Sequence, residues 1–166
     1  MHFEEGSNYV NEENSTTNQQ TLTIQQAIDL GVEHLNVGRL PEAENIYNQI
    51  LQSTPDHLVA LNFLGLIAHQ KGDNDLAAEL IRKVLAIKPD FTEAYNNLGL
   101  VLREQGKLDE AVESYKKALS FYPDYAEIHN NLGNALQEIG KLDEAVTSYH
   151  QALDINPDYA EAHNNA

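Results

Sequence analysis

The stretch TEAYNNLGLVLREQGKLDEAVESYKKALSFYPDY, residues 92–125, contains the pattern that decides the fold. Its apolar side chains recur three or four residues apart in two runs, which is the spacing of amphipathic helices. Gly106 separates the two runs, and Pro123 follows the second, where a proline ring prevents a helix from continuing. The stretch is therefore predicted to form a helical hairpin.

The same pattern recurs along the chain at a fixed interval of 34 residues. The residues that keep this step are Pro55, Pro89, Pro123 and Pro157, the turn glycines Gly38, Gly72, Gly106 and Gly140, the helix glycines Gly31, Gly65, Gly99 and Gly133, and the alanines Ala43, Ala77, Ala111 and Ala145. A period shared by independent residue types is the signature of a repeat architecture. It divides the chain into units at residues 24–57, 58–91, 92–125 and 126–159, and residues 160–166 begin a fifth unit.

Glycines within the predicted helices indicate close packing inside each hairpin. A mid-helix glycine costs about 1 kcal/mol relative to alanine unless a neighbouring segment must come close. Ala111 and Ala145 are expected to face Gly99 and Gly133 from the second helix of each hairpin.

Acidic residues follow each of the later prolines with a spacing typical of helix starts. Asp90 with Glu93, Asp124 with Glu127, and Asp158 with Glu161 match the capping box, in which side chains accept hydrogen bonds from unpaired backbone amides. Much of the chain's acidity thus has a structural explanation.

The first 23 residues differ in composition from the rest. Twelve of them are Ser, Thr, Asn or Gln, and four are glutamates. So little apolar surface cannot offset the entropy of ordering the segment, so residues 1–23 are expected to form a disordered polar leader.

The charge balance restricts the partners. The chain has 26 acidic and 10 basic residues and a formal net charge of −16, which disfavours nucleic acids and anionic membranes. No run approaches the roughly 20 apolar residues of a membrane-spanning helix, and the acidic start lacks the features of a secretory signal. We therefore expect a cytoplasmic protein.

Catalytic and metal sites find no candidates in the sequence. His129 and His163 occupy equivalent places in successive units, about 10 Å or more apart, which is too far to share a zinc ion. Paired carboxylates such as Asp109 and Glu110 open second helices, where the helix dipole favours them. Because the chain has no cysteine and no phosphate-binding loop, we expect no metal, no cofactor and no enzymatic activity.

The third unit contains, in this order, Leu98, Gly99, Gly106, Ala111, Tyr115, Ala118 and Pro123. This order resembles the tetratricopeptide repeat. The likeness covers residues 24–159 without an insertion, although His34 and Pro41 depart from it in the first unit. It implies an all-α fold, a right-handed superhelical solenoid of antiparallel helix pairs whose first helices line a groove for an extended peptide.

The resemblance also implies which residues line that groove, namely the second, fifth, sixth and ninth of each unit. The positions are Val59, Asn62, Phe63, Leu66, Glu93, Asn96, Asn97, Leu100, Glu127, Asn130, Asn131, Asn134, Glu161, Asn164 and Asn165. Arg103, near the end of a first helix, is a further candidate that could pair with an acidic group of a ligand.

The predominance of asparagine in this set suggests a ladder of side-chain amides. Each amide offers donors and an acceptor, so a row of them could hold a peptide main chain with little regard to its sequence. The alternative is that the asparagines satisfy one another or bind water.

We therefore expect a protein-binding or peptide-binding scaffold. A second hypothesis is a truncated substrate-recognition arm, since the Asn131–Asn134 stretch is similar to the amino-terminal superhelix of O-linked N-acetylglucosamine transferases and their bacterial relatives. A third is a scaffold that self-associates through its uncapped C-terminal end, where the fourth unit would leave an apolar face.

Overall fold

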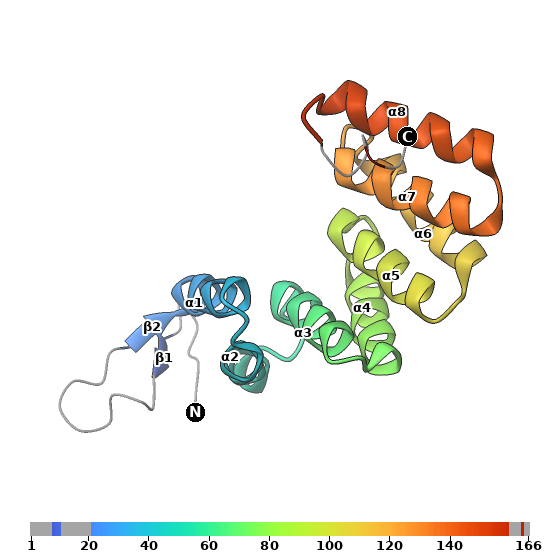
Figure 1. The fold of residues 1–166 in the computed structure, drawn as a ribbon. Coiled ribbons are helices and arrows are strands. Elements are labelled where there is room, and N and C mark those ends of the chain that lie inside the picture. The colour runs from blue at the N-terminus through green and yellow to red at the C-terminus, as the bar shows by residue number, and fades with distance from the viewer. Residues whose placement is uncertain (1–7, 11–20, 160–163, 165–166) are drawn as a thin grey trace.

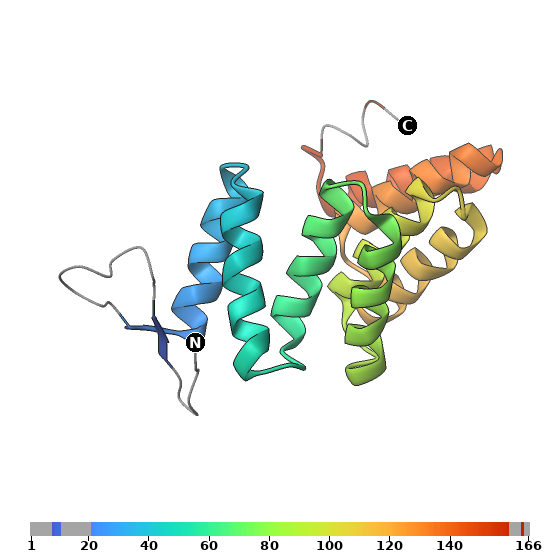
Figure 2. The same ribbon diagram turned by 90° about the horizontal axis from the view of Figure 1, so that it is seen from below.

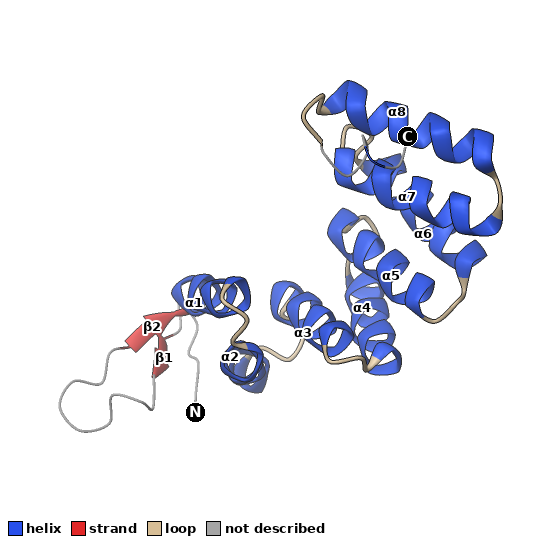
Figure 3. Cartoon of the chain, in the orientation of Figure 1, coloured by secondary structure: helices blue, strands red, loops and turns tan. Residues whose placement is uncertain are grey.

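The computed structural model describes residues 8–10, 21–159 and 164, and this part of the chain is almost entirely helical (Figures 1 and 3). The helices are α1 (Ile24–Asn36), α2 (Leu40–Ser53), α3 (Leu58–Gln70), α4 (Asn74–Ile87), α5 (Thr92–Glu104), α6 (Leu108–Phe121), α7 (Ala126–Ile139) and α8 (Leu142–Ile155). Consecutive helices pair as hairpins, and one hairpin lies in each predicted unit. The fold is an all-α right-handed solenoid, and Figure 2 shows its hairpins side by side along the array.

Each hairpin is closed by a large side chain from its second helix. Tyr47, Tyr115 and Tyr149 are at most 1% exposed, and a Cβ placed on the facing glycine would overlap their rings. The tyrosine follows the predicted alanine by four residues, one helical turn further on. At Gly65 the backbone carbonyl of Ala77, the equivalent of Ala111 and Ala145, also lies close, 3.5 Å from the Cβ position. That Ala111 and Ala145 themselves face the glycines stays a prediction.

The tight turns inside the hairpins require a backbone conformation that suits glycine. Gly106 has φ of 73°, in the left-handed region. The next residue, Lys107, donates its backbone amide to the carbonyl of Leu102 at 2.8 Å, which satisfies a carbonyl at the end of α5.

The predicted capping boxes at Asp90 and Asp124 do not form. The residues at the N-caps of α5 and α7 are Phe91 and Tyr125, and neither helix has a side-chain cap bond. Each helix begins one residue later than the box requires, so the aspartate lies outside the cap position. The partner of Asp158 in the corresponding pair, Glu161, lies outside the described residues.

A capping box forms instead at α1. The Thr23 hydroxyl accepts from the backbone amide of Gln26 at 3.2 Å, and the Gln26 side chain accepts from the amide of Thr23 at 2.9 Å. The start of the solenoid is thereby fixed by residues at the edge of the predicted leader.

The expected leader contains backbone pairing. Strands β1 (Asn8–Val10) and β2 (Thr21–Thr23) form an antiparallel ladder in which Tyr9 lies opposite Leu22. Both strands also contact α1, and the disorder of the leader as a whole stays a prediction. The rest of the leader, residues 1–7 and 11–20, lies outside the described part.

Of the expected fifth unit, Asn164 is helical and exposed, and residues 160–163 and 165–166 lie outside the described part.

Substitution of Gly99 by leucine tests the close approach inside the third hairpin. The new side chain would collide with the buried ring of Tyr115, and we expect a loss of about 1–3 kcal/mol in unfolding free energy, measured by urea titration. Glu104→Leu, which places the same side chain at an exposed position of the same helix, is the control and should change stability by less than about 0.5 kcal/mol. Equal stability of the two variants would contradict the packing argument.

Candidate peptide-binding face

The first helices of the second, third and fourth units pack directly on one another, α3 on α5 and α5 on α7. We call the side of these three helices that holds the second, fifth, sixth and ninth positions of their units the first-helix face. It contains the positions that the sequence predicted to line a groove.

Hydrogen bonds between asparagines connect these helices. Asn97 donates from its side-chain nitrogen to the side-chain oxygen of Asn62, and Asn131 donates in the same way to Asn96, each at 3.0 Å. Both pairs are 35 residues apart, so the sixth position of one unit reaches the fifth position of the unit before it. Asn96 in turn donates to the Glu127 carboxylate at 3.2 Å. The amides thus join successive repeats.

These asparagines are also buried. Their exposed fractions are 7% for Asn62, 6% for Asn96, 7% for Asn97, 0% for Asn130 and 8% for Asn131. A buried amide that is already bonded has little capacity left for a ligand. The structure therefore shows the alternative arrangement, in which asparagines satisfy one another, and their direct binding of a peptide stays a prediction. Asn165 lies outside the described residues.

The accessible part of the first-helix face is made by the second and ninth positions of the units. Glu93 and Glu127 are exposed, while Leu66, Leu100 and Asn134 are half-buried. The face therefore offers carboxylates beside apolar and amide groups, with the buried asparagines beneath them.

Arg103 lies in an ion pair that joins two repeats. Its Nε donates to the Glu138 carboxylate at 2.6 Å, again across 35 residues. Burial opposes the charge of the guanidinium, but the bond to Glu138 and its negative charge raise the pKa of Arg103 overall. Arg103 therefore pairs with an acidic residue of its own chain, whereas the sequence suggested that it could pair with an acidic group of a ligand. The spacing of 35 between Arg103 and Glu138 is the sequence signal that could have revealed this pair.

Two equivalent tyrosines differ in their hydroxyl contacts. The Tyr149 hydroxyl lies 2.8 Å from the side-chain oxygens of both Asn134 and Gln137. The buried Tyr115 hydroxyl has no hydrogen-bond partner among the residues that the structure describes. The reason is the first helix above it, which has Leu100 and Arg103 where the next unit has Asn134 and Gln137.

No group of three or more histidine, aspartate or glutamate side chains that could hold a metal ion occurs in the described part of the chain. None of the helices described is both long and apolar enough to cross a membrane.

Comparison with known families agrees with this geometry. Family profiles described as TPR or tetratricopeptide repeats match residues 28–91, 80–113, 99–140 and 126–159. The chain belongs to the tetratricopeptide repeat family. Among curated proteins, no sequence matches the chain.

Solved tetratricopeptide repeat structures share the fold. The crystal structure of MamA is 23% identical over 82% of this chain and 80% of its own, with a TM-score of 0.72. The pilF structure of Pseudomonas aeruginosa is 24% identical over 86% of this chain and 65% of its own, with a TM-score of 0.80. The Cut9–Hcn1 structure is 21% identical over 87% of this chain and 29% of its own, with a TM-score of 0.79. At these identities the likeness shows the fold alone.

A double-mutant cycle on Asn96 and Asn131 tests whether the amide bonds hold the repeats together. Asn131→Ala leaves a buried acceptor unpaired and should lower the unfolding free energy by about 1–3 kcal/mol. The cycle should return a coupling energy of about 0.5–1.5 kcal/mol between the two residues. Asn48→Ala, at an exposed site on α2, is the control. A coupling energy of zero would show that the bond contributes nothing to stability.

Phenylalanine substitutions at Tyr115 and Tyr149 form a second matched test. Tyr149→Phe removes a bonded hydroxyl and should cost about 0.5–1.5 kcal/mol, whereas Tyr115→Phe should cost less than about 0.5 kcal/mol at neutral pH. Thermal unfolding of both variants measures the difference. Equal losses would contradict the assigned contacts.

The buried Tyr115 should also make the folding stability depend on pH. Burial raises the pKa of Tyr115, so the folded state favours the protonated phenol. The contribution of this protonated phenol to the unfolding free energy is at its full value below about pH 10. It decreases as the pH rises above that value, because Tyr115 loses its proton in the unfolded chain before it does so in the folded protein. Stability should decline less steeply above about pH 10 in Tyr115→Phe than in the wild type, as followed by circular dichroism.

Proposed function

We propose that this tetratricopeptide repeat protein is an interaction scaffold that holds an extended segment of a partner protein along the first-helix face. The proposal is supported chiefly by the register of accessible side chains on that face. Leu66, Leu100 and Asn134 occupy one position of successive units, and Glu93 and Glu127 another. An extended segment could meet equivalent side chains at each repeat.

The buried asparagines have a defined part in this proposal. Their bonds between repeats fix the spacing of α3, α5 and α7, so the side chains above them are held in position before a ligand arrives. Binding to a rigid surface loses less conformational entropy than binding to a mobile one. We propose that any direct amide contact with the peptide is secondary to this positioning.

The scaffold acts without catalysis in this proposal, and its cytoplasmic location stays a prediction from the sequence. The likeness to transferase recognition arms also stays a prediction.

Peptides selected from a random display library on the immobilised protein test the groove. Leu66→Ala combined with Leu100→Ala removes apolar surface from the first-helix face while keeping good helix formers. We expect the affinity of selected peptides to fall about tenfold or more, as measured by fluorescence anisotropy.

Leu142→Ala is the matched control, because Leu142 is 60% exposed on α8, outside the first-helix face. It should leave affinity unchanged. Peptides that bind the double variant and the control as tightly as the wild type would refute this use of the face.

Self-association through α8 is a second candidate function, which a specific observation favours. Val146 is 42% exposed, whereas its equivalents Ala78 and Val112, covered by the next repeat, are 3% and 5% exposed. A first helix from another copy would fit this face. Sedimentation equilibrium should show a concentration-dependent mass that Val146→Lys reduces, and a monomer at all concentrations would exclude the idea.

A further inference from the structure

A surface pocket of about 650 Å³ lies at one edge of the solenoid, beside Glu93 of the first-helix face. It is formed by the turn that joins α4 to α5 and the turn that joins α6 to α7. Its lining contains four aromatic residues, Phe91, Phe121, Tyr122 and Tyr125, and four polar residues, Lys88 and Asp90 before α5 and Thr92 and Glu93 at its start. We call it the edge pocket.

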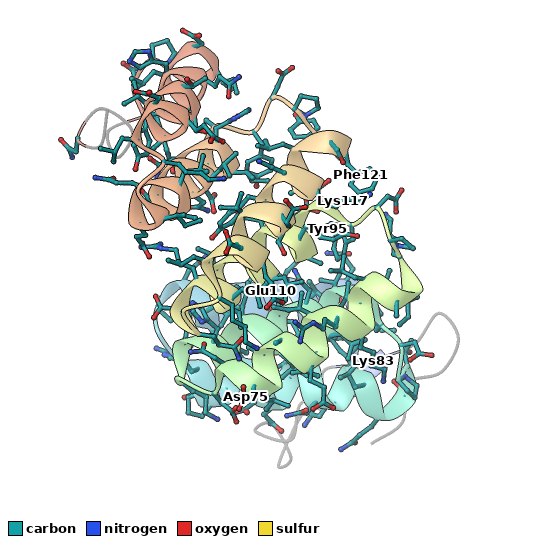
Figure 4. The ribbon with its side chains drawn as sticks, turned by 90° about the vertical axis from the view of Figure 1, so that its right-hand side faces the viewer. Asp75, Lys83, Tyr95, Glu110, Lys117 and Phe121 are labelled. Carbon is teal, nitrogen blue, oxygen red and sulfur yellow. The ribbon has the colours of Figure 1, made fainter. Side chains whose placement is uncertain are left out.

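Two rings of the edge pocket, Phe121 and Tyr122, are accessible, and each contacts another ring. Phe121 stacks on Tyr95 with ring centroids 6.0 Å apart, and Tyr122 meets Tyr125 edge-on at 5.7 Å. Phe121 is 41% exposed and Tyr122 is 53% exposed. Figure 4 shows Phe121, Tyr95 and Lys117 gathered near the end of α6.

Comparison of the units shows that the fold does not require the adjacent aromatic residues Phe121 and Tyr122. At the same positions of the preceding unit the chain has Ile87 and Lys88, and at those of the following unit it has Ile155 and Asn156. Those units form the same hairpin without exposing two rings. Exposed apolar clusters beyond what folding needs are typical of interaction sites.

The polar groups around the rings favour a positive ligand. Asp90 and Glu93 line the pocket against a single lysine, Lys88. Burial raises the pKa of Tyr125, and the negative charges of Glu127 and Glu93 raise it further, so the field at this phenol is negative.

The chain's own lysines already use the rings as cation sites. The ammonium group of Lys88 lies 5.5 Å from the centroid of the Phe91 ring, and that of Lys117 lies 5.2 Å from the centroid of Phe121. These are cation–π distances. The rings of Tyr122 and Tyr125 have no such lysine in the part of the chain that the structure describes, which leaves them for a cation from outside.

We propose that the edge pocket docks an arginine or lysine side chain of a cationic partner segment, stacked on Tyr122 and Tyr125 and paired with Asp90. Arginine is the preferred residue, because its planar guanidinium both stacks on aromatic rings and forms two hydrogen bonds with a carboxylate. The site shares Glu93 with the first-helix face, but its aromatic rings lie outside the positions of the peptide path proposed above, so either site could exist without the other.

Fluorescein-labelled peptides of alternating glycine and arginine, glycine and lysine, and glycine and serine test the proposal by anisotropy near physiological salt. We expect the arginine peptide to bind most tightly and the serine peptide not to bind. Phe121→Ile combined with Tyr122→Asn should weaken the arginine peptide about tenfold. This variant introduces the residues of the following unit, so the hairpin is expected to fold, and circular dichroism checks that it does.

The single variant Tyr122→Thr, which introduces the residue found at Thr54 in the first unit, provides a second arm with the same expected direction. Asp90→Lys and Glu79→Lys change the net charge equally, and only the former lies at the pocket. We expect the former alone to reduce binding strongly.

If both aromatic variants bind the arginine peptide as tightly as the wild type does, the proposal is overturned. The attraction would then come from the overall negative charge of the protein. Equal losses in the two charge variants would also overturn the proposal. Amide chemical-shift changes at Phe91 and Tyr125 on peptide addition would support the site, whereas changes confined to Leu66 and Leu100 would overturn it. The library-selected peptides test the first-helix face, and the arginine peptide tests the edge pocket. A negative result with the library peptides does not change the result expected for the arginine peptide, so the two proposals can fail separately.

Discussion

The contact between a mid-helix glycine and a large side chain of the following helix sets the geometry of every hairpin in this protein. In three of the four units that side chain is a tyrosine, and in the second it is Ile81. Because there is no room for a Cβ at the glycine, the two helices approach closely and cross at nearly the same place in each unit. A constant hairpin lets equal surfaces stack, and the solenoid follows from that repetition.

Stacking then depends on contacts between units, and these include polar contacts as well as the apolar core. The bonds Asn97–Asn62, Asn131–Asn96 and Arg103–Glu138 all connect residues 35 apart. Burial of the asparagines makes these bonds costly to lose, because an unpaired buried amide cannot return to water. The same bonds change the role that we assign to the asparagines of the predicted groove. Its asparagines support the surface, and the acidic, apolar and amide side chains around them are what a partner would meet.

The two surfaces of interest have different origins in the sequence. The first-helix face is periodic, so its character changes slowly from one unit to the next. The edge pocket comes from a departure, the pair Phe121 and Tyr122, at positions where neighbouring units have other residues. In a repeat protein the units serve as internal references, and a residue that the architecture does not need stands out by comparison with its equivalents.

Periodicity was sufficient to predict the helices, the hairpins and the unit boundaries, because helix formation and glycine turns depend on residues close in sequence. The resemblance to the family indicated which positions would line a groove, and that role stays a prediction. The side-chain partners could not be assigned from the sequence. Three examples are whether Asn97 faces a ligand or Asn62, whether the ring of Tyr115 reaches Gly99, and whether Asp90 caps α5. The first two depend on packing between segments 16 and 35 residues apart, and the third depends on the residue at which α5 begins, so only the three-dimensional arrangement decides them.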